Sequence, residues 1–242
     1  MALKIVVIGG GPGGYVAALK AADLGADVVL IEKQDLGGTC LNWGCIPSKI
    51  MRNSAELLLK CLKGSKQGLD IQGDIRFDIK GLMAHKDKIV DSQKKGIHAL
   101  LTSRKVRLEM GKAKIIASGK IEVKSNQGGT KALSYDRLIL AVGTRPLEVT
   151  DFPFDHKKIL SSNDMLCLER IPKSLTIVGG GVIGCEFAFI YSALGTRVTV
   201  VEALSRPLPL PSVDRDISKL LVREMKKQKI SFAREQEGDV VL

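Results

Sequence analysis

The 242-residue sequence contains no long apolar run and few aromatic side chains. No hydrophobic stretch reaches the roughly 20 residues that a membrane-spanning helix needs. The N-terminus enters an apolar segment without the basic and small-residue features of a signal peptide. These absences predict a cytoplasmic protein without a membrane partner. Aromatic residues make up 4% of the chain and glycines number 25, a composition typical of an α/β protein with many tight turns.

Aromatic residues are also absent from the basic segments. The net charge of +11 would suit a nucleic-acid partner, but single-strand binders interleave aromatic side chains with basic ones so that bases can stack. We therefore interpret the positive charge as a solvated surface and expect no nucleic-acid partner. The basic residues are scattered over segments 60–66, 86–95, 104–124 and 219–229.

The sequence also lacks a pattern of metal ligands. It has five cysteines and three histidines. Cys40 and Cys45 do not have the C-x-x-C spacing of a zinc site, no second pair follows, and no histidine is near. We expect no metal. The remaining cysteines, Cys61, Cys167 and Cys185, are expected to be small buried side chains.

The segment Gly37–Lys49, GGTCLNWGCIPSK, is the most distinctive part of the chain. In a regular helix, residues five apart have Cα atoms roughly 8 to 9 Å apart, whereas a disulfide tolerates no more than about 7 Å. A bond between Cys40 and Cys45 therefore requires a distorted backbone, which Gly44 permits and Pro47 favours. A helix N-terminus would also stabilise a thiolate. In a reducing compartment such a pair is predicted to be transient and catalytic; the alternative is an inert or accidental pair.

A dinucleotide-binding fingerprint occupies the N-terminus. An apolar run at residues 3–9 breaks at GGGPGG, a helical stretch follows at 15–24, and a second apolar run at 28–31 ends at Glu32. In such a βαβ unit the first glycine makes the turn, the second lets a pyrophosphate approach the helix N-terminus, and the third lets helix and strand pack closely. The acid at the strand end can accept hydrogen bonds from ribose hydroxyls. The glycines in these roles are Gly9, Gly11 and Gly14.

The same unit returns in the second half of the chain. Apolar runs at 175–178 and 198–201 flank Gly179, Gly181 and Gly184, and Glu202 follows Gly179 at the spacing that separates Glu32 from Gly9. We therefore predict an α/β chain with two Rossmann-like dinucleotide-binding domains built on parallel sheets, the second incomplete. The proline-rich stretch 146–153 suggests domains at 1–148 and 149–242.

The intervening sequence is less informative. Helical patterns cover 53–62 and 79–103. Short strands are expected at 106–109, 113–117 and 120–124, separated by Gly111 and Gly119, and another at 138–142. Further strands are expected at 229–232 and in the terminal DVVL, 239–242.

These motifs, together with AVGTRP at 141–146, resemble the flavin-dependent pyridine nucleotide-disulfide oxidoreductases. The resemblance spans nearly the whole chain and implies FAD and NAD as cofactors. It implies that Cys40 exchanges with the substrate, that Cys45 lies nearest the flavin, and that Lys49 pairs with Glu186. The FAD-binding residues would be Gly9, Gly11, Pro12, Gly13, Gly14, Glu32, Lys33, Gly38, Thr39, Lys49, Ala113, Gly143 and Thr144. The NAD-binding residues would be Gly179, Gly181, Val182, Ile183, Gly184 and Glu202.

The form of the cysteine segment further implies oxidation of dihydrolipoamide by NAD. The partner would be a lipoyl-bearing dithiol of a 2-oxo acid dehydrogenase complex or a glycine cleavage system. Glu202 favours NAD over NADP because a carboxylate binds a free 2′-hydroxyl and repels a 2′-phosphate; glutathione-reductase-like relatives would place basic residues around that position.

Alternatives to this reading are a mercuric or glutathione-type reductase, a catalytically incomplete dinucleotide-binding module, and a flavin monooxygenase. Family members are longer and form homodimers through a C-terminal domain that this sequence lacks. We accordingly expect a monomer or a weak associate.

Overall fold

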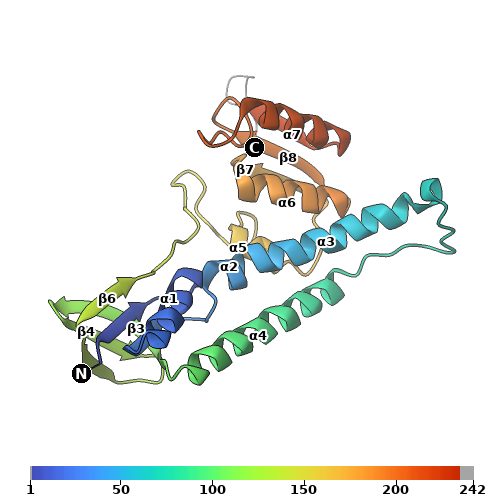
Figure 1. Cartoon of the computed structure of the whole chain (residues 1–242). Coiled ribbons are helices and arrows are strands. Elements are labelled where there is room, and N and C mark those ends of the chain that lie inside the picture. The colour runs from blue at the N-terminus through green and yellow to red at the C-terminus, as the bar shows by residue number, and fades with distance from the viewer. Residues whose placement is uncertain (1, 235–242) are drawn as a thin grey trace. The chain divides into compact units, whose positions relative to one another are not determined.

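The computed structural model describes residues 2–234. The chain forms two compact units, Met1–Pro47 with Asp87–Pro153, and Ser48–Lys86 with Phe154–Leu242. Two long helices, α3 (Cys45–Leu62) and α4 (Ile79–Ser103), contribute residues to both units (Figure 1). Each unit has its own sheet and its own hydrophobic core.

The first unit is built on a sheet with the strand order β5-β4-β3-β2-β1-β6. Strands β1, β2, β6 and the start of β3 are parallel, and β3, β4 and β5 form an antiparallel meander. Helix α1 connects β1 to β2 as a βαβ crossover. The bounds are β1 (Lys4–Ile8), α1 (Pro12–Asp23), β2 (Asp27–Glu32), α2 (Gly38–Trp43), β3 (Arg107–Ala117), β4 (Lys120–Ser125), β5 (Thr130–Ser134) and β6 (Arg137–Leu140).

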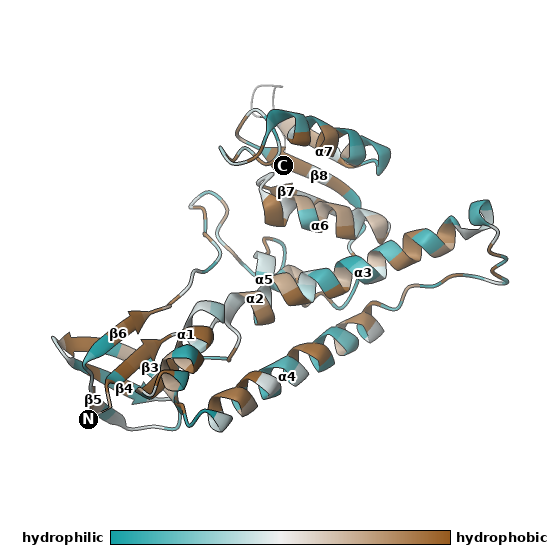
Figure 2. Ribbon diagram, viewed as in Figure 1, coloured by the Kyte–Doolittle hydropathy of each residue, from teal (hydrophilic) through white to brown (hydrophobic). Residues whose placement is uncertain are grey.

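The central strands of this sheet are buried on both faces. Val6 and Val7 are adjacent in β1 and point to opposite faces, yet both are almost completely buried. Val7 packs in a cluster with Leu101 of α4, whereas Val6 packs with Ile121 of β4. Burial on both faces explains why β1 and β2 are continuous apolar runs rather than alternating ones. Figure 2 shows these strands as largely hydrophobic.

The second unit is built on the parallel sheet β7-β8-β9. Helix α6 connects β7 to β8 and is hydrophobic almost all round, whereas α7 is amphipathic (Figure 2). The most buried large side chain of α6 is Tyr191, whose hydroxyl donates to the carbonyl of Met165 at 2.5 Å. The bounds are η1 (Gly64–Gln67), α5 (Ser162–Met165), β7 (Ser174–Val178), α6 (Val182–Ala193), β8 (Arg197–Glu202), α7 (Arg215–Lys227) and β9 (Ser231–Arg234).

The expected α/β class with parallel βαβ units is confirmed. One prediction in the first unit is wrong: residues 106–109 and 113–117 do not form two strands, because β3 runs unbroken through Gly111. A Cβ at Gly111 would lie 2.4 Å from the carbonyl oxygen of Lys124. Glycine there allows a close approach of two strands and does not end one.

Other element boundaries also shifted. Strand β6 ends at Leu140, short of the predicted 142, and β9 begins at Ser231, later than the predicted 229. Strand β5 had not been predicted. The strand expected at 239–242 lies outside the described residues, and the division into domains at residue 148 stays a prediction. Among residues 2–234, no helix is long and apolar enough to cross a membrane.

Candidate functional site

The first glycine loop brings α1 directly onto the end of β1. Gly9 has a φ of +106°, and its N–H donates to the carbonyl of Ile31 at 2.8 Å. A Cβ at Gly14 would lie 1.7 Å from the carbonyl oxygen of Gly9, so no larger residue fits there. Gly11 is the N-cap of α1; because glycine has no side chain to cap the helix, the first-turn N–H groups are left for an anion.

Glu32 is fixed at the end of β2. Its side chain is buried, and Oε2 accepts from the N–H of Gly10 at 2.6 Å while Oε1 accepts from the N–H of Gln34 at 2.8 Å. Each carboxylate oxygen can accept more than one hydrogen bond. The carboxylate is thus oriented by the backbone and keeps capacity for two hydroxyl groups.

The cysteine segment packs against this glycine loop. The N–H of Gly37 donates to the carbonyl of Gly10 at 2.8 Å, and a Cβ at Gly38 would lie only 2.6 Å from the Cα of Gly11. Asn42 fixes the backbone where the chain enters α2, because its Nδ2 donates to the carbonyls of Leu36 and Gly38 at 3.0 and 2.9 Å. Sequence reasoning missed Asn42; its position between the two cysteines was the available signal.

The backbone breaks between the two cysteines. Helix α2 ends at Trp43, its C-cap Gly44 has a φ of −149° and a ψ of −116° that are not helical, and α3 begins at Cys45. A break of this kind is what a bond between Cys40 and Cys45 would require; the bond itself stays a prediction. Cys40 is half-buried and Cys45 is exposed. Cys45 is the first residue of α3.

Other residues that the resemblance assigns to the first cofactor surround the carboxyl ends of these strands. Gly143 has a φ of +67° and follows β6, which pairs with β1 in parallel. Ala113 lies in β3 beyond Met110, the partner of Glu32. Pro12, Gly13, Lys33, Thr39, Gly143 and Thr144 are exposed. Their ligand roles stay predictions.

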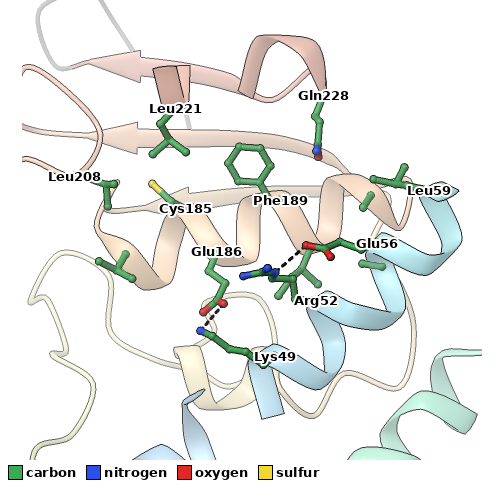
Figure 3. A pocket seen from close by; sticks show the side chains of 14 residues that line it. Lys49, Arg52, Glu56, Leu59, Cys185, Glu186, Phe189, Leu208, Leu221 and Gln228 are labelled. Atoms are coloured by element: carbon green, nitrogen blue, oxygen red, sulfur yellow. Dashed lines mark hydrogen bonds and ion pairs between the residues drawn. The ribbon is translucent and has the colours of Figure 1, made fainter. Parts of the chain in front are cut away.

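Lys49 and Glu186 form an ion pair within the second unit. The Nζ of Lys49 lies 2.6 Å from Oε1 of Glu186, and the hydroxyl of Ser48 donates to Oε2 at 3.1 Å (Figure 3). The Lys49 side chain is 52% exposed, so the pair adds little stability, about 0 to 1 kcal/mol. It lies at the edge of a largely apolar pocket of about 480 Å³ lined by α3 and α6. Ser48 had not been predicted, although it is adjacent to Lys49 in the motif.

The second glycine loop repeats the geometry of the first. Gly179 has a φ of +105°, and a Cβ at Gly184 would lie 2.0 Å from its carbonyl oxygen. Glu202 is buried; its Oε2 accepts from the N–H of Gly180 at 2.7 Å and its Oε1 accepts from the N–H of Leu204 at 2.9 Å. In each half of the chain, the acid at the strand end is therefore oriented by two equivalent backbone N–H groups, one in the glycine loop and one two residues after the acid.

The space around the second loop suits a dinucleotide. Apart from Gly181 itself and its two chain neighbours, no heavy atom of the described residues lies within 4 Å of a Cβ built at Gly181, the N-cap of α6. Val182 and Ile183, in the first turn, are more than half exposed. Open space, uncapped N–H groups and an oriented carboxylate are the features that a pyrophosphate and a ribose require.

The three remaining cysteines differ in environment. Cys185 is buried and its thiol donates to the carbonyl of Gly180 at 3.2 Å. Burial, with a smaller contribution from the charge of Glu202, raises the pKa of this thiol to about 11. Cys61 is half-buried and Cys167 is exposed, so the expectation of burial is wrong for Cys167, which follows the short helix α5 at the surface. Among residues 2–234, no cluster of three or more acidic, histidine or cysteine side chains could hold a metal.

Comparison with known proteins gives one family. The family model described as pyridine nucleotide-disulphide oxidoreductase matches residues 3–238. Dihydrolipoyl dehydrogenase of Bacillus subtilis is 37% identical over 226 residues, which cover 93% of this chain and 49% of the relative. The mitochondrial dihydrolipoyl dehydrogenase of Dictyostelium discoideum is 39% identical over 230 residues, 94% of this chain and 46% of the relative.

A solved structure extends the same likeness to the fold. LpdA from Mycobacterium tuberculosis superposes with a TM-score of 0.87 at 26% identity, covering 96% of this chain and 51% of that chain. The chain thus spans about half the length of the curated relatives it matches.

Proposed function

Because the chain belongs to the pyridine nucleotide-disulphide oxidoreductase family, we propose that it carries the cofactor sites and the redox cysteines of a dihydrolipoamide dehydrogenase. The cofactors of this family are FAD and NAD(H). We assign FAD to residues 1–148 and NAD(H) to residues 149–242. The observation that supports the proposal best is the helix break at Gly44, which separates two cysteines next to the first glycine loop.

The cysteine pair would carry the exchange with a dithiol substrate. A substrate thiolate attacks the Cys40 sulfur of the Cys40–Cys45 disulfide, and the Cys45 sulfur leaves as a thiolate. The second substrate thiol then attacks the substrate sulfur of the mixed disulfide, releasing Cys40 and closing the substrate disulfide. Two electrons and two protons have passed from the substrate to the protein, which now holds the reduced pair.

The residues around the first glycine loop would hold FAD, which would supply two-electron transfer between the cysteine pair and the NAD held at the second loop. The sum of the proposed reaction is dihydrolipoamide plus NAD⁺ to lipoamide, NADH and a proton. The chain's own residues prepare this transfer. Lys49, one helical turn after Cys45 in α3, supplies a cation whose position is held by Glu186. Glu32 and Glu202 would accept hydrogen bonds from the ribose hydroxyls.

The setting of the protein is also proposed. A lipoyl group on a 2-oxo acid dehydrogenase complex or a glycine cleavage protein would be the substrate, the protein would act in the cytoplasm, and the chain would be a monomer or weak associate. The names of the relatives support the lipoyl substrate. Light scattering tests the last point, and a tight dimer would contradict it.

A second candidate is a dinucleotide-binding module that does not turn over. It is supported by the repeated geometry of the two glycine loops and their oriented acids, which nucleotide binding alone would require. Such a module would retain the glycine loops and the oriented glutamates described above.

The visible absorption spectrum separates the two candidates. The purified protein is supplied with FAD and titrated without oxygen, first with NADH and then with dihydrolipoamide. We expect flavin bands and a new long-wavelength absorption on reduction, which Cys45→Ser abolishes and the matched Cys61→Ser retains. Flavin bands without a new long-wavelength absorption on reduction would favour the module, and an unaltered response in Cys45→Ser would refute the redox role of the pair.

A further inference from the structure

The loop that follows each strand-end acid returns to the glycine loop in the same way. In the first unit the N–H of Gly37 donates to the carbonyl of Gly10 at 2.8 Å; in the second, the N–H of Leu208 donates to the carbonyl of Gly180 at 2.7 Å. Both donors have a positive φ, +93° at Gly37 and +51° at Leu208. Glycine adopts this conformation freely, but leucine does so only when its surroundings hold it there.

One side chain holds each returning loop. In the first unit it is Asn42, which donates to two loop carbonyls. In the second unit it is Arg206. Its Nη1 donates to the carbonyl of Leu208 at 3.1 Å and to Oγ of Ser218 at 2.5 Å. Its Nη2 donates to the carbonyls of Leu210 and Val213 at 3.2 and 3.0 Å.

These contacts use every N–H of the two terminal guanidinium nitrogens. A guanidinium has five N–H donors, four of them on Nη1 and Nη2, so only Nε–H remains. The anchor of the contacts is Ser218, which lies in the first turns of α7 and is 2% exposed. Arg206 therefore connects the loop after β8 to the first turns of α7. By fixing the position of Leu208, it also holds the hydrogen bond from the N–H of Leu208 to the carbonyl of Gly180.

We propose that Arg206 is the positioning residue of the second dinucleotide site and not a ligand of a 2′-phosphate. Arg206 holds the hydrogen bond from the N–H of Leu208 to the carbonyl of Gly180. The N–H of Gly180 in turn donates to the carboxylate of Glu202. The carboxylate is therefore oriented for the 2′-hydroxyl of NAD(H) before the nucleotide binds. A nearby arginine can accommodate the 2′-phosphate of NADP(H) in this type of fold, but the contacts of Arg206 occupy the N–H groups of both terminal nitrogens. The inference rests on the proposed function for the identity of the nucleotide, but not for the clamping of the loop.

Nucleotide titration tests the choice of ligand. NADH and NADPH are titrated by their fluorescence into the wild type, Arg206→Met, Arg206→Lys and the matched control Arg223→Met, which alters an exposed arginine of α7. We expect both Arg206 variants to bind NADH about tenfold more weakly or worse, the control to match the wild type, and NADPH to bind weakly throughout. Lysine cannot rescue, because one ammonium group cannot satisfy four separated acceptors. If Arg206→Met instead lost NADPH and kept NADH, or if Arg206→Lys retained tight NADPH binding, Arg206 would be a phosphate ligand and the proposal would be overturned.

Hydrogen exchange tests the clamp without any nucleotide. We expect the Leu208 amide to be protected in the wild type and in Arg223→Met and to exchange faster in both Arg206 variants, with Ser218→Ala, which removes one acceptor, changing it in the same direction by less. Unchanged protection in the Arg206 variants would overturn the proposal. A wild type that binds neither nucleotide but shows this exchange pattern would refute the proposed function while supporting the clamp.

Discussion

The environment of a single thiol distinguishes Cys185 from the redox pair. Burial and the nearby charge of Glu202 raise its pKa from the ordinary 9.0 to about 11. Because the thiolate is the reactive form, we expect iodoacetamide at pH 8 to label Cys185 far more slowly than the exposed Cys167. Peptide mapping by mass spectrometry after timed labelling measures both sites in one sample.

The same shift has a consequence for stability. Between pH 9 and about pH 11 the folded state keeps a proton on Cys185 that the unfolded chain has released, so the free energy of unfolding falls as the pH rises through this range. Cys185→Ala should remove this part of the pH dependence.

In the labelling experiment, modification of Cys185 as fast as Cys167 in the native protein would contradict the raised pKa of Cys185.

At the residue scale, the sequence could identify groups whose chemistry depends on their own motif. The glycines, the two cysteines and the acids Glu32 and Glu202 belong to this class, because their spacing already implies a turn, a thiol pair or a strand end. Asn42, Ser48 and Arg206 could not be identified in this way. Their roles depend on which carbonyls and carboxylates the folded chain places beside them. The positions of Asn42 and Ser48 inside the cysteine motif single them out but do not reveal these contacts.

At the scale of elements, the contact between β1 and α1 makes two adjacent glycines respond oppositely to the same substitution. In Gly14→Ala the new methyl group would overlap the carbonyl oxygen of Gly9, 1.7 Å away, whereas in Gly13→Ala the nearest atom, the methyl of Ala141, is 3.9 Å away. We expect Gly14→Ala to lower the free energy of unfolding by about 1 to 3 kcal/mol. Gly13→Ala should leave it unchanged or raise it by up to about 1 kcal/mol, because alanine is the better helix former.

Urea denaturation of the two variants under identical conditions measures this difference. Equal destabilisation would mean that the helix does not rest on the strand as described. Flavin retention adds a second readout, because a displaced α1 would also move the N–H groups at its first turn.

Helices and strands were predicted correctly where the sequence pattern was long. The prediction failed at a glycine, which can either end a strand or allow two strands to approach closely. Helix α4 was predicted to its limits at 79 and 103, because 25 residues with a helical period leave little ambiguity. Gly111 was taken as the end of a strand, but it permits the close pairing of β3 with β4. Strand β5 is five residues long and largely exposed, so it carries almost no hydrophobic signal.

At the scale of the molecule, the two compact units do not follow the order of the sequence. Residues 48–86 belong with the C-terminal half, although they precede most of the first sheet. The cause is that different parts of the long helices pack into different cores. Met51 and Ala55 of α3 and Leu82 of α4 belong to the core of the second unit. Further along α4, Val90, Ile97 and Leu101 belong to the core of the first unit. Hydrophobic periodicity predicted both helices but could not indicate that each changes partner along its length.

The internal repeat and the separate cores predict that the two nucleotide sites can be lost independently. In Gly184→Ala the methyl group would lie 2.0 Å from the carbonyl oxygen of Gly179. The equivalent distance in Gly14→Ala, from the methyl group to the carbonyl oxygen of Gly9, is 1.7 Å. We expect Gly184→Ala to weaken NADH binding at least about tenfold while the flavin spectrum persists. Gly14→Ala should reverse this pattern.

Flavin absorbance and NADH titration of both variants measure the two sites side by side, with Gly96→Ala as the tolerated control because Gly96 is an exposed residue of α4 with space for a Cβ. Loss of both cofactors in either variant would show that the cores of the two units do not fold independently. If each variant loses only its own cofactor, the two glycine loops are separate binding elements. The redox cysteines would then be expected to follow the first loop, since Gly37 and Gly38 are the residues that contact it, and Gly14→Ala should lower the response to dihydrolipoamide even where NADH still binds.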